Sequence, residues 1–143
     1  MGEARRVMDA VTEAVFKGDA EDLANLYAPD AVAVTPDEGE LRGRDQIIRY
    51  LKQFADAFPD AQFESLYKHE SGNTAVDEGF FTGTNTAPLA TPTGVSIPAT
   101  GKQVRLRECD VAAVENGVIV SHRFYFDQME FLGQLGLLPE TPS

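Results

Sequence analysis

The sequence predicts an α+β fold, in which three N-terminal helices pack on the concave face of a strongly curved, mostly antiparallel sheet. Two observations support this prediction. Apolar residues recur at helical spacing in three segments before Pro59, whereas long runs from Phe63 onward alternate between apolar and polar residues. Glycines at Gly79 and Gly83 interrupt one strand-like run, and strand glycines often mark the bends of a curved sheet. Such a sheet can hold a cavity beneath the helices.

Size and composition limit the class of protein. A chain of 143 residues is most simply one domain, residues 1–143, which buries roughly two-thirds of its unfolded surface without disulfides or metals. The net charge of −11 argues against binding to nucleic acid or to anionic membranes. The single Cys109 cannot form an internal disulfide and fits a reducing compartment. With no signal-peptide pattern and no apolar run of membrane-spanning length, we expect a cytoplasmic protein.

Three helices are predicted in the first 58 residues. The first ends at Gly18, the second is capped by Asp19 and broken at Pro29-Asp30, and the third begins at Asp45 and ends before Pro59. Their apolar stripes are Val7, Ala10, Val11, Ala14 and Val15; then Leu23, Leu26 and Tyr27; then Ile47, Ile48, Leu51, Phe54, Ala55 and Phe58.

The remaining chain reads mainly as strands and turns. We expect strands at residues 32–35, 63–69 and 74–84, a polar loop at 36–43, and a turn at Ser71-Gly72-Asn73. Residues 85–100 contain three prolines and little periodicity, which makes them a candidate loop over a pocket mouth. Asp127 is placed to cap a final short helix that ends near Gly136, and residues 139–143 read as a frayed tail.

The stretch from Val104 to Asp127 is predicted to be a β-hairpin around an Asn-Gly turn. A three-residue loop with Gly117 in a bulge would pair Val114 with Val118 and place Asp110 opposite His122. This register joins the two more apolar faces of the hairpin, and we prefer it because it buries more apolar surface.

A two-residue loop is the alternative register. It would pair Glu115 with Val118 and place Asp110 opposite Arg123. Because one residue of slip reverses every side chain, the cavity would then receive a different set: Asp110, Arg123, Tyr125 and Asp127.

The preferred register places three ionisable residues, Glu108, Asp110 and His122, on an apolar sheet face. Buried ionisable groups are costly unless they pair or do chemistry, so these are the candidate catalytic residues. Desolvation would raise the pKa of Asp110 and make it a stronger base or a neutral donor, with His122 as base or proton shuttle and Glu108 coupled to Asp110. Alternatively, Asp110 and His122 form a satisfied structural pair.

Several motifs resemble a known superfamily. The Gly18-Asp19 break, the segment Tyr27-Ala28-Pro29-Asp30-Ala31-Val32 and the helix start Gly43-Arg44-Asp45 resemble the cystatin-like cone of NTF2-like proteins. Within that superfamily, Gly83-Thr84-Asn85, the segment from Ile97 to Lys102 and the segment from Phe126 to Leu137 resemble the SnoaL-like polyketide (ester) cyclases. The resemblance covers nearly the whole chain.

The resemblance implies a small cofactor-free protein, often a dimer, whose apolar pocket closes a polycyclic ring by an aldol reaction. SnoaL-like cyclases use a His-x-Asp pair; His122 occupies the His position, but Phe124 stands at the Asp position. Asp110 and Glu108 match polar positions of the preceding strand. Related ketosteroid isomerases carry a base where this chain has Thr35-Pro36, so that route is not predicted, although Asp110 matches their oxyanion-binding acid.

We therefore expect cofactor-free cyclase or isomerase chemistry on an apolar polycyclic or polyketide-like molecule, with no metal site. One alternative is a non-catalytic ligand-binding or dimeric scaffold domain, and another is a cofactor-free polyketide hydroxylase. Arg123 and Tyr125, on the outer sheet face, suit a homodimer interface. The candidate pocket-lining residues are Tyr27, Tyr50, Phe54, Phe58, Phe80, Phe124 and Phe126.

Overall fold

The computed structural model describes residues 2–90 and 95–138. Within them, the chain forms an α+β fold, as predicted, with a mixed sheet in the order β2-β1-β8-β7-β4-β3. The helices are α1 (Glu3–Lys17), α2 (Ala20–Leu26), α3 (Arg44–Ala57) and α4 (Gln128–Gln134). The strands are β1 (Tyr27–Thr35), β2 (Gly39–Arg42), β3 (Gln62–Ser71), β4 (Thr74–Thr84), β7 (Gln103–Glu115) and β8 (Val118–Phe126), with a separate short pair, β5 (Leu89–Ala90) and β6 (Ser96–Ile97).

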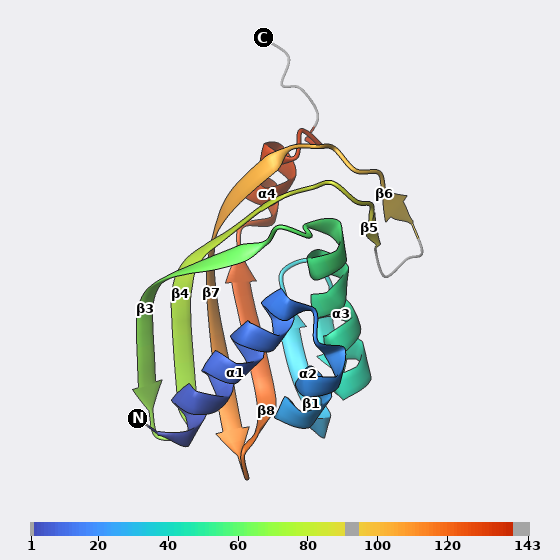
Figure 1. The fold of residues 1–143 in the computed structure, drawn as a ribbon. Helices are drawn as coiled ribbons and strands as arrows, with labels where there is room; N and C mark the ends of the chain where they lie inside the picture. The colour runs from blue at the N-terminus through green and yellow to red at the C-terminus, as the bar shows by residue number, and fades with distance from the viewer. Residues whose placement is uncertain (1, 91–94, 139–143) are drawn as a thin grey trace.

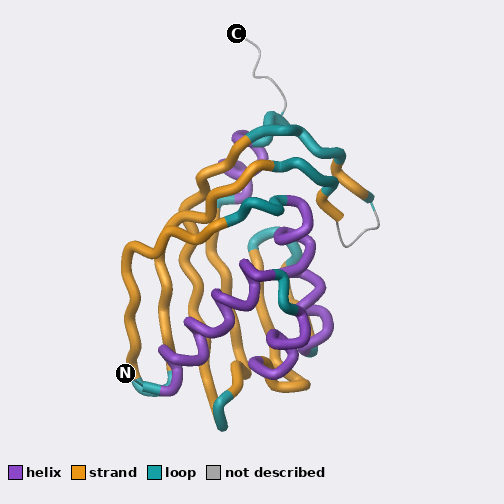
Figure 2. The backbone as a smooth tube through the Cα atoms, viewed as in Figure 1, coloured by secondary structure: helices purple, strands orange, loops and turns teal. Residues whose placement is uncertain are grey.

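The helices and the sheet form two layers. Helices α1 to α3 cover one face of the sheet, and β3, β4 and β7 bend over toward the end of α3 (Figure 1). The bend lies within the strands themselves, as the backbone trace shows (Figure 2). Strand β1 runs parallel to β8, and the other neighbouring strands are antiparallel. The opposite face carries no helix in the described part of the chain and is the outer face of the sheet.

Gly79 has a steric role at the bend. The β3–β4 register shifts between Ser65 and Tyr67, and there the two backbones approach so closely that a Cβ at Gly79 would overlap the carbonyl oxygen of Glu64. Only glycine fits such an approach. The glycine is therefore required here by the close approach of β3 and β4.

The helix ends follow the sequence signals. Gly18 closes α1 in the left-handed conformation, at φ 69°, and the Asp19 side chain accepts a hydrogen bond from the backbone N–H of Asp22. Asp127 caps α4 in the same way, accepting from the backbone N–H groups of Met129 and Glu130. The predicted tail at residues 139–143 lies outside the described residues.

Strand β1 is longer than predicted. It begins at Tyr27 instead of residue 32, because Tyr27 pairs with Ile119 of β8 and this pairing outweighs the local helical spacing. The predicted polar loop at 36–43 also contains a strand: residues 39–42 form β2, which pairs with the end of β1 at the edge of the sheet.

The β7–β8 hairpin has the two-residue loop that we considered less favourable. Asn116 and Gly117 both have positive φ, 53° and 79°, and Glu115 pairs with Val118. This geometry is the tight Asn-Gly turn whose twist matches the flanking strands. Our preferred three-residue loop is therefore wrong.

A β-bulge in β8 changes which side chains of this hairpin face inward. The register shifts after the Val114–Ile119 pair, and the extra residue Val120 in β8 reverses the alternation beyond it. Asp110 then lies opposite Phe124, so both predicted partners of Asp110, His122 and Arg123, are wrong as ladder pairs. Beyond the bulge, our preferred inner face, with His122, Phe124 and Phe126, is the one formed, whereas nearer the turn Ile119, from the face that our preferred register would have turned outward, is buried in the core.

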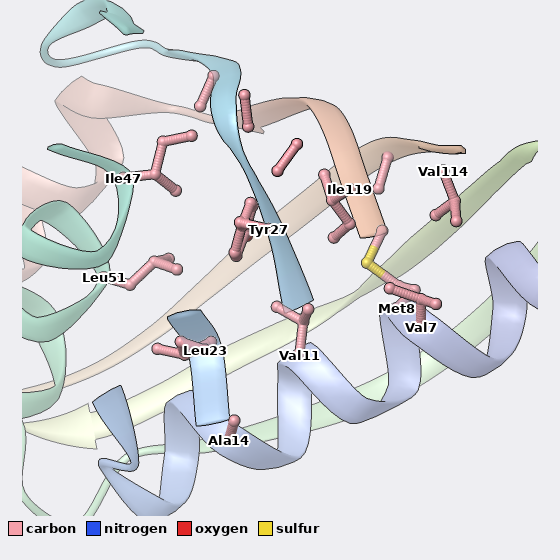
Figure 3. Close-up of a cluster of buried hydrophobic side chains, with 14 of the residues drawn as sticks. Val7, Met8, Val11, Ala14, Leu23, Tyr27, Ile47, Leu51, Val114 and Ile119 are labelled. Atoms are coloured by element: carbon pink, nitrogen blue, oxygen red, sulfur yellow. The ribbon is translucent and has the colours of Figure 1, made fainter. Parts of the chain in front are cut away.

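The core has two apolar clusters. The larger packs α1, α2 and α3 against β1, β7 and β8; its residues include Val7, Met8, Val11, Ala14, Leu23, Tyr27, Ile47, Leu51, Val114 and Ile119 (Figure 3). The smaller lies at the α4 end and contains Ala57, Phe58, Leu89, Val104, Leu106, Phe131 and Leu135. The candidate site opens between these clusters.

Candidate functional site

A cavity of about 120 Å³ lies between the helices and the inner face of the sheet. Most of its wall is aliphatic or aromatic, and its carboxyl and imidazole groups come from the β7–β8 hairpin. It is lined by Val11, Thr12, Val15, Phe16, Tyr50, Leu51, Phe54, Phe63, Phe81, Leu106, Glu108, Asp110, His122, Phe124, Phe126 and Phe131. The predicted juxtaposition of Glu108, Asp110 and His122 at a cavity is therefore observed.

His122 links two buried side chains. Its Nε2 lies 2.6 Å from Asp110 Oδ2, and its Nδ1 lies 2.7 Å from the Tyr27 hydroxyl. One assignment satisfies both contacts: Nε2–H donates to the Asp110 carboxylate, and the Tyr27 hydroxyl donates to Nδ1. His122 is 1% exposed and Asp110 8%, so this chain of hydrogen bonds is shielded from bulk water.

Glu108 extends this chain into the cavity. Burial, followed by the nearby Asp110 carboxyl, raises the pKa of Glu108 well above its usual value. When Glu108 is neutral, its carboxyl O–H can donate to the neighbouring Asp110 carboxyl, because the two side chains lie two residues apart on one face of β7. Its Oε1 is shielded from solvent and receives no hydrogen bond from any donor among the described residues.

A charged layer lies behind the two carboxyls. Asp77 pairs with Asp110 across β4 and β7, and its Oδ1 lies 2.5 Å from Nη2 of Arg5 on α1. Both residues of this ion pair are buried. Burial raises the pKa of Asp77, and Asp110 raises it further, while Arg5 acts in the opposite direction. Arg5 is therefore the cation that offsets the acidic side of the site.

Aromatic side chains surround the polar residues. Phe124 stacks on His122, with ring centroids 4.0 Å apart and an interplanar angle of 25°. Tyr50 and Phe54 pack edge to face, and Tyr50 also contacts Phe124. The Tyr50 hydroxyl donates to Asp37 Oδ1 at 2.9 Å, and burial raises the pKa of Tyr50 well above its usual value.

The predicted lining residues divide into two groups. Tyr50, Phe54, Phe124 and Phe126 line the cavity, whereas Tyr27, Phe58 and Phe80 do not. Tyr27 lies behind His122, and Phe58 belongs to the smaller apolar cluster. Phe80 is on the outer face, where the Arg105 guanidinium lies 3.6 Å from its ring centroid.

Sequence reasoning missed several lining residues. Phe81 lines the cavity in place of its neighbour Phe80, and Phe63 and Phe131 also contribute. Alternation along residues 74–84 contained the signal for Phe81, since Asp77 and Phe81 share a face. Helix α1 supplies Val11, Thr12, Val15 and Phe16, although its stripe reads as ordinary core.

Two other expectations concern the surroundings of the site. Arg123 and Tyr125 lie on the outer face, as predicted, and Tyr125 is 54% exposed. Residues 85–90 and 95–100, the described parts of the predicted mouth loop, do not line the cavity. Within residues 2–90 and 95–138, no group of three or more His, Cys, Asp or Glu side chains is arranged to hold a metal ion. No helix in those ranges has the length and apolarity needed to span a membrane.

Comparison with known proteins identifies the family. Residues 5–135 match the SnoaL-like polyketide cyclases. The chain belongs to this family. Comparison with curated protein sequences found no match. Asp110 and His122 at the cavity therefore lie within a SnoaL-like domain. The family resemblance expected from the sequence motifs is confirmed.

Solved structures share the SnoaL-like fold. A SnoaL-like polyketide cyclase from Jannaschia is 15% identical, with 96% of this chain and 94% of the other aligned at a TM-score of 0.82. IdmH, a proposed polyketide cyclase from Streptomyces antibioticus, is 26% identical over 94% and 99% of the two chains, with a TM-score of 0.77. An NTF2-like protein from Burkholderia pseudomallei is 20% identical over 94% and 98%, with a TM-score of 0.76. The NTF2-like fold is therefore confirmed.

Proposed function

We propose that this SnoaL-like protein is a cofactor-free cyclase or isomerase that performs acid–base chemistry on an apolar, polyketide-like molecule. The observation that carries the proposal is the pair of neighbouring carboxyls, Glu108 and Asp110, at the wall of an otherwise apolar cavity, where Oε1 of Glu108 has no donor partner among the described residues. The likeness to IdmH supports the same reaction class.

Ring closure by an aldol reaction needs a proton removed next to one carbonyl and a proton delivered to the oxygen of another. Two carboxyls that share a proton can do both, because one accepts while the other donates. In the proposed step, the free oxygen of Glu108 takes the substrate proton, and the proton that Glu108 held passes to Asp110. The neutral pair can then return a proton to the product oxygen.

His122 has a positioning role in this proposal. Both of its nitrogens are engaged, by Tyr27 and by Asp110, so neither is free to accept a substrate proton directly. The His122 Nε2–H donates to Asp110 and fixes the orientation of that carboxyl. This differs from our initial hypothesis, in which His122 was itself a candidate base.

The position of Asp110 offers a way for this chain to lack the Asp of the family's His-x-Asp pattern. Phe124 stands where the pattern has its Asp, and Asp110 is the direct cross-strand partner of Phe124. Side chains of directly opposed residues occupy neighbouring space on one face of a sheet. Asp110 can therefore supply the carboxylate to His122 from β7 instead of β8.

Exchange of α-protons tests the proposed chemistry without knowledge of the natural substrate. We expect the protein to accelerate the loss of the methyl-proton signal of acetophenone in D₂O, followed by ¹H NMR, and to close heptane-2,6-dione to a cyclohexenone. Asp110→Asn and Glu108→Gln should each lower the exchange rate at least about tenfold. Phe80→Leu, on the outer face, should leave it unchanged.

Other outcomes would favour the alternative functions. No acceleration of either reaction, combined with ligand binding, would favour a non-catalytic binding or scaffold domain. Oxygen consumption with a hydroxyanthraquinone, absent in Asp110→Asn, would favour a hydroxylase. If Asp110→Asn and His122→Ala instead mainly lower the melting temperature, the Asp110–His122 pair is structural.

We also propose that a second copy of the chain pairs on the outer sheet face. The support is an uncovered face that carries Tyr125 and Val34, which are 54% and 44% exposed. Exposed apolar and aromatic residues on one face are typical of interfaces. Light scattering should give a dimer mass, and Tyr125→Glu should shift it toward the monomer; a monomer at all concentrations would contradict the proposal.

A further inference from the structure

The polar groups on the described wall of the cavity leave hydrogen-bond acceptors, but no donors, free for a ligand. Both nitrogens of His122 are occupied, and Asp110 interacts with His122 and with Glu108. Glu108 lines the cavity, its Oε1 is buried, and no donor among the described residues reaches that oxygen. A half-buried carboxyl at the cavity wall therefore offers one free acceptor.

The hydroxyl hydrogens of the other polar wall residues are already donated within the protein. The Thr12 hydroxyl donates to the Met8 carbonyl oxygen within α1. The Tyr50 hydroxyl donates to Asp37. A ligand consequently meets no free donor on the described wall, and its matching group must itself be a donor.

The charge of the site restricts the ligand further. Glu108, Asp110 and Asp77 lie together, and Arg5 is the cation that faces them from α1. Arg5 is fully engaged by Asp77, Asp9 and backbone carbonyls, so it offers nothing to a ligand anion. An anionic ligand would be repelled and left without a partner.

The cavity volume limits how much of a ligand can enter. A dry apolar cavity of about 150 Å³ is known to hold benzene. The cavity here, at about 120 Å³, matches one ring of similar size, walled by Phe54, Phe81 and Phe124. A larger ligand would place one ring inside and the rest at the opening.

We propose that the cavity recognises one neutral, hydroxylated ring, a phenol or a cyclic enol, whose O–H donates to the free oxygen of Glu108. This deepens the proposed function by naming the class of ligand, and it rests on that function only in taking the cavity as the ligand site. Glu108, more than His122, is then the residue that touches the ligand's polar group.

Binding of small fluorinated probes to the full chain tests this directly by ¹⁹F NMR. The probes are 4-fluorophenol, fluorobenzene, 4-fluoroanisole, whose oxygen accepts but cannot donate, and 4-fluorobenzoate, which is an anion. We expect 4-fluorophenol to bind about three- to tenfold more tightly than fluorobenzene or 4-fluoroanisole, as one net hydrogen bond predicts. We expect 4-fluorobenzoate to bind most weakly.

Two substitutions assign the preference to Glu108. Glu108→Leu should bring the phenol and fluorobenzene affinities together, because the acceptor is gone. Glu108→Gln keeps an acceptor carbonyl and can still donate to Asp110, so it should retain most of the preference. Thr12→Val is the matched control at the cavity wall and should leave the ratio unchanged.

Several results would overturn the proposal. Equal binding of 4-fluorophenol and 4-fluoroanisole to the wild-type chain would show that donation does not matter, even if Glu108→Leu failed to fold. A preference that survives Glu108→Leu would exclude Glu108 as the acceptor, and no binding of any probe would exclude this ligand class. A Glu108-dependent phenol preference without α-proton exchange would support the ligand class while contradicting the proposed catalysis.

Discussion

Strands β7 and β8 carry charged residues on both faces, in two different environments. On the inner face, Asp110 and His122 are almost fully buried and hydrogen-bonded at 2.6 Å. On the outer face, Arg105 pairs with Glu64 of β3 at 3.0 Å, but both side chains are more than half exposed. The same hairpin therefore permits a direct comparison of buried and solvated charges.

Burial decides what each charged group does. Solvated ion pairs contribute little, because water and salt screen them and long side chains lose freedom on pairing. Buried groups have no such alternative partner, so each must find one within the protein or change its protonation state. The inner face responds in both ways: Arg5 pairs with Asp77, and the pKa of Glu108 is raised.

The largest expected effect is on the buried ion pair. Arg5→Ala leaves Asp77, which is 2% exposed, without its cation, and we expect the free energy of unfolding to fall by about 3–5 kcal/mol. Urea denaturation monitored by circular dichroism measures this change. Asp77→Asn in the Arg5→Ala background should recover a large part of the loss, because the unpaired charge is then absent. A loss below about 1 kcal/mol would contradict a dependence of Asp77 on Arg5.

A smaller loss of stability is expected when Tyr27, which lies behind His122, is substituted. Tyr27→Phe removes the hydroxyl that donates to His122 Nδ1 and leaves a buried acceptor unsatisfied, at a cost of about 1–3 kcal/mol. Thermal and urea unfolding measure it. Tyr125→Phe is the matched control, since Tyr125 is on the outer face of the same sheet and should change stability by less than about 0.5 kcal/mol. Equal effects of the two substitutions would remove the distinction between the faces.

The pH dependence of the free energy of unfolding should reveal the burial of Glu108. Its pKa is raised in the folded protein, chiefly by burial, so the folded state holds this proton more tightly than the unfolded chain does. As the pH rises above the ordinary Glu pKa, the unfolded chain ionises first, and the wild-type protein loses stability relative to Glu108→Gln. The variant should match the wild type near pH 3 and exceed it by about 1 kcal/mol or more at pH 7.

A control separates this effect from general charge removal. Glu115→Gln, at the exposed end of β7, should show no comparable gain between pH 3 and pH 7. Urea denaturation at a series of pH values gives both curves. A difference for Glu108→Gln that is constant with pH would mean that ionisation of Glu108 is not what the folded state disfavours.

The sequence identified the faces of this hairpin but not its register. Alternation told which residues share a surface, and burial favoured the face with Asp110, His122 and Phe124, which is the inner face. The register depends on the bulge at Val120, and a bulge is fixed by pairing with β1 and β7 together. Local patterns carry no information on such a choice.

Other features of the site depended on contacts between distant segments. Arg5 and Asp77 lie on α1 and β4, and nothing in either local pattern links them. Phe80 and Phe81 are adjacent aromatic residues, so composition alone could not tell which faces the cavity; alternation from Asp77 would have chosen Phe81. Helix caps, by contrast, were predicted at Gly18, Asp19 and Asp127, because capping is a local interaction.

The smallest expected effect on stability comes from the exposed ion pair of the outer face. Glu64→Gln removes the charge that pairs with Arg105 but keeps the size of the side chain, and Arg105 retains its contact with the Phe80 ring. We expect the free energy of unfolding to change by less than about 0.5 kcal/mol, with the residual difference disappearing at 1 M salt. The Asp77→Asn variant, measured in parallel, should keep its effect at high salt, because Asp77 and Arg5 are shielded from mobile ions. If Glu64→Gln and Asp77→Asn responded equally to salt, burial would not be what separates the two faces of the sheet.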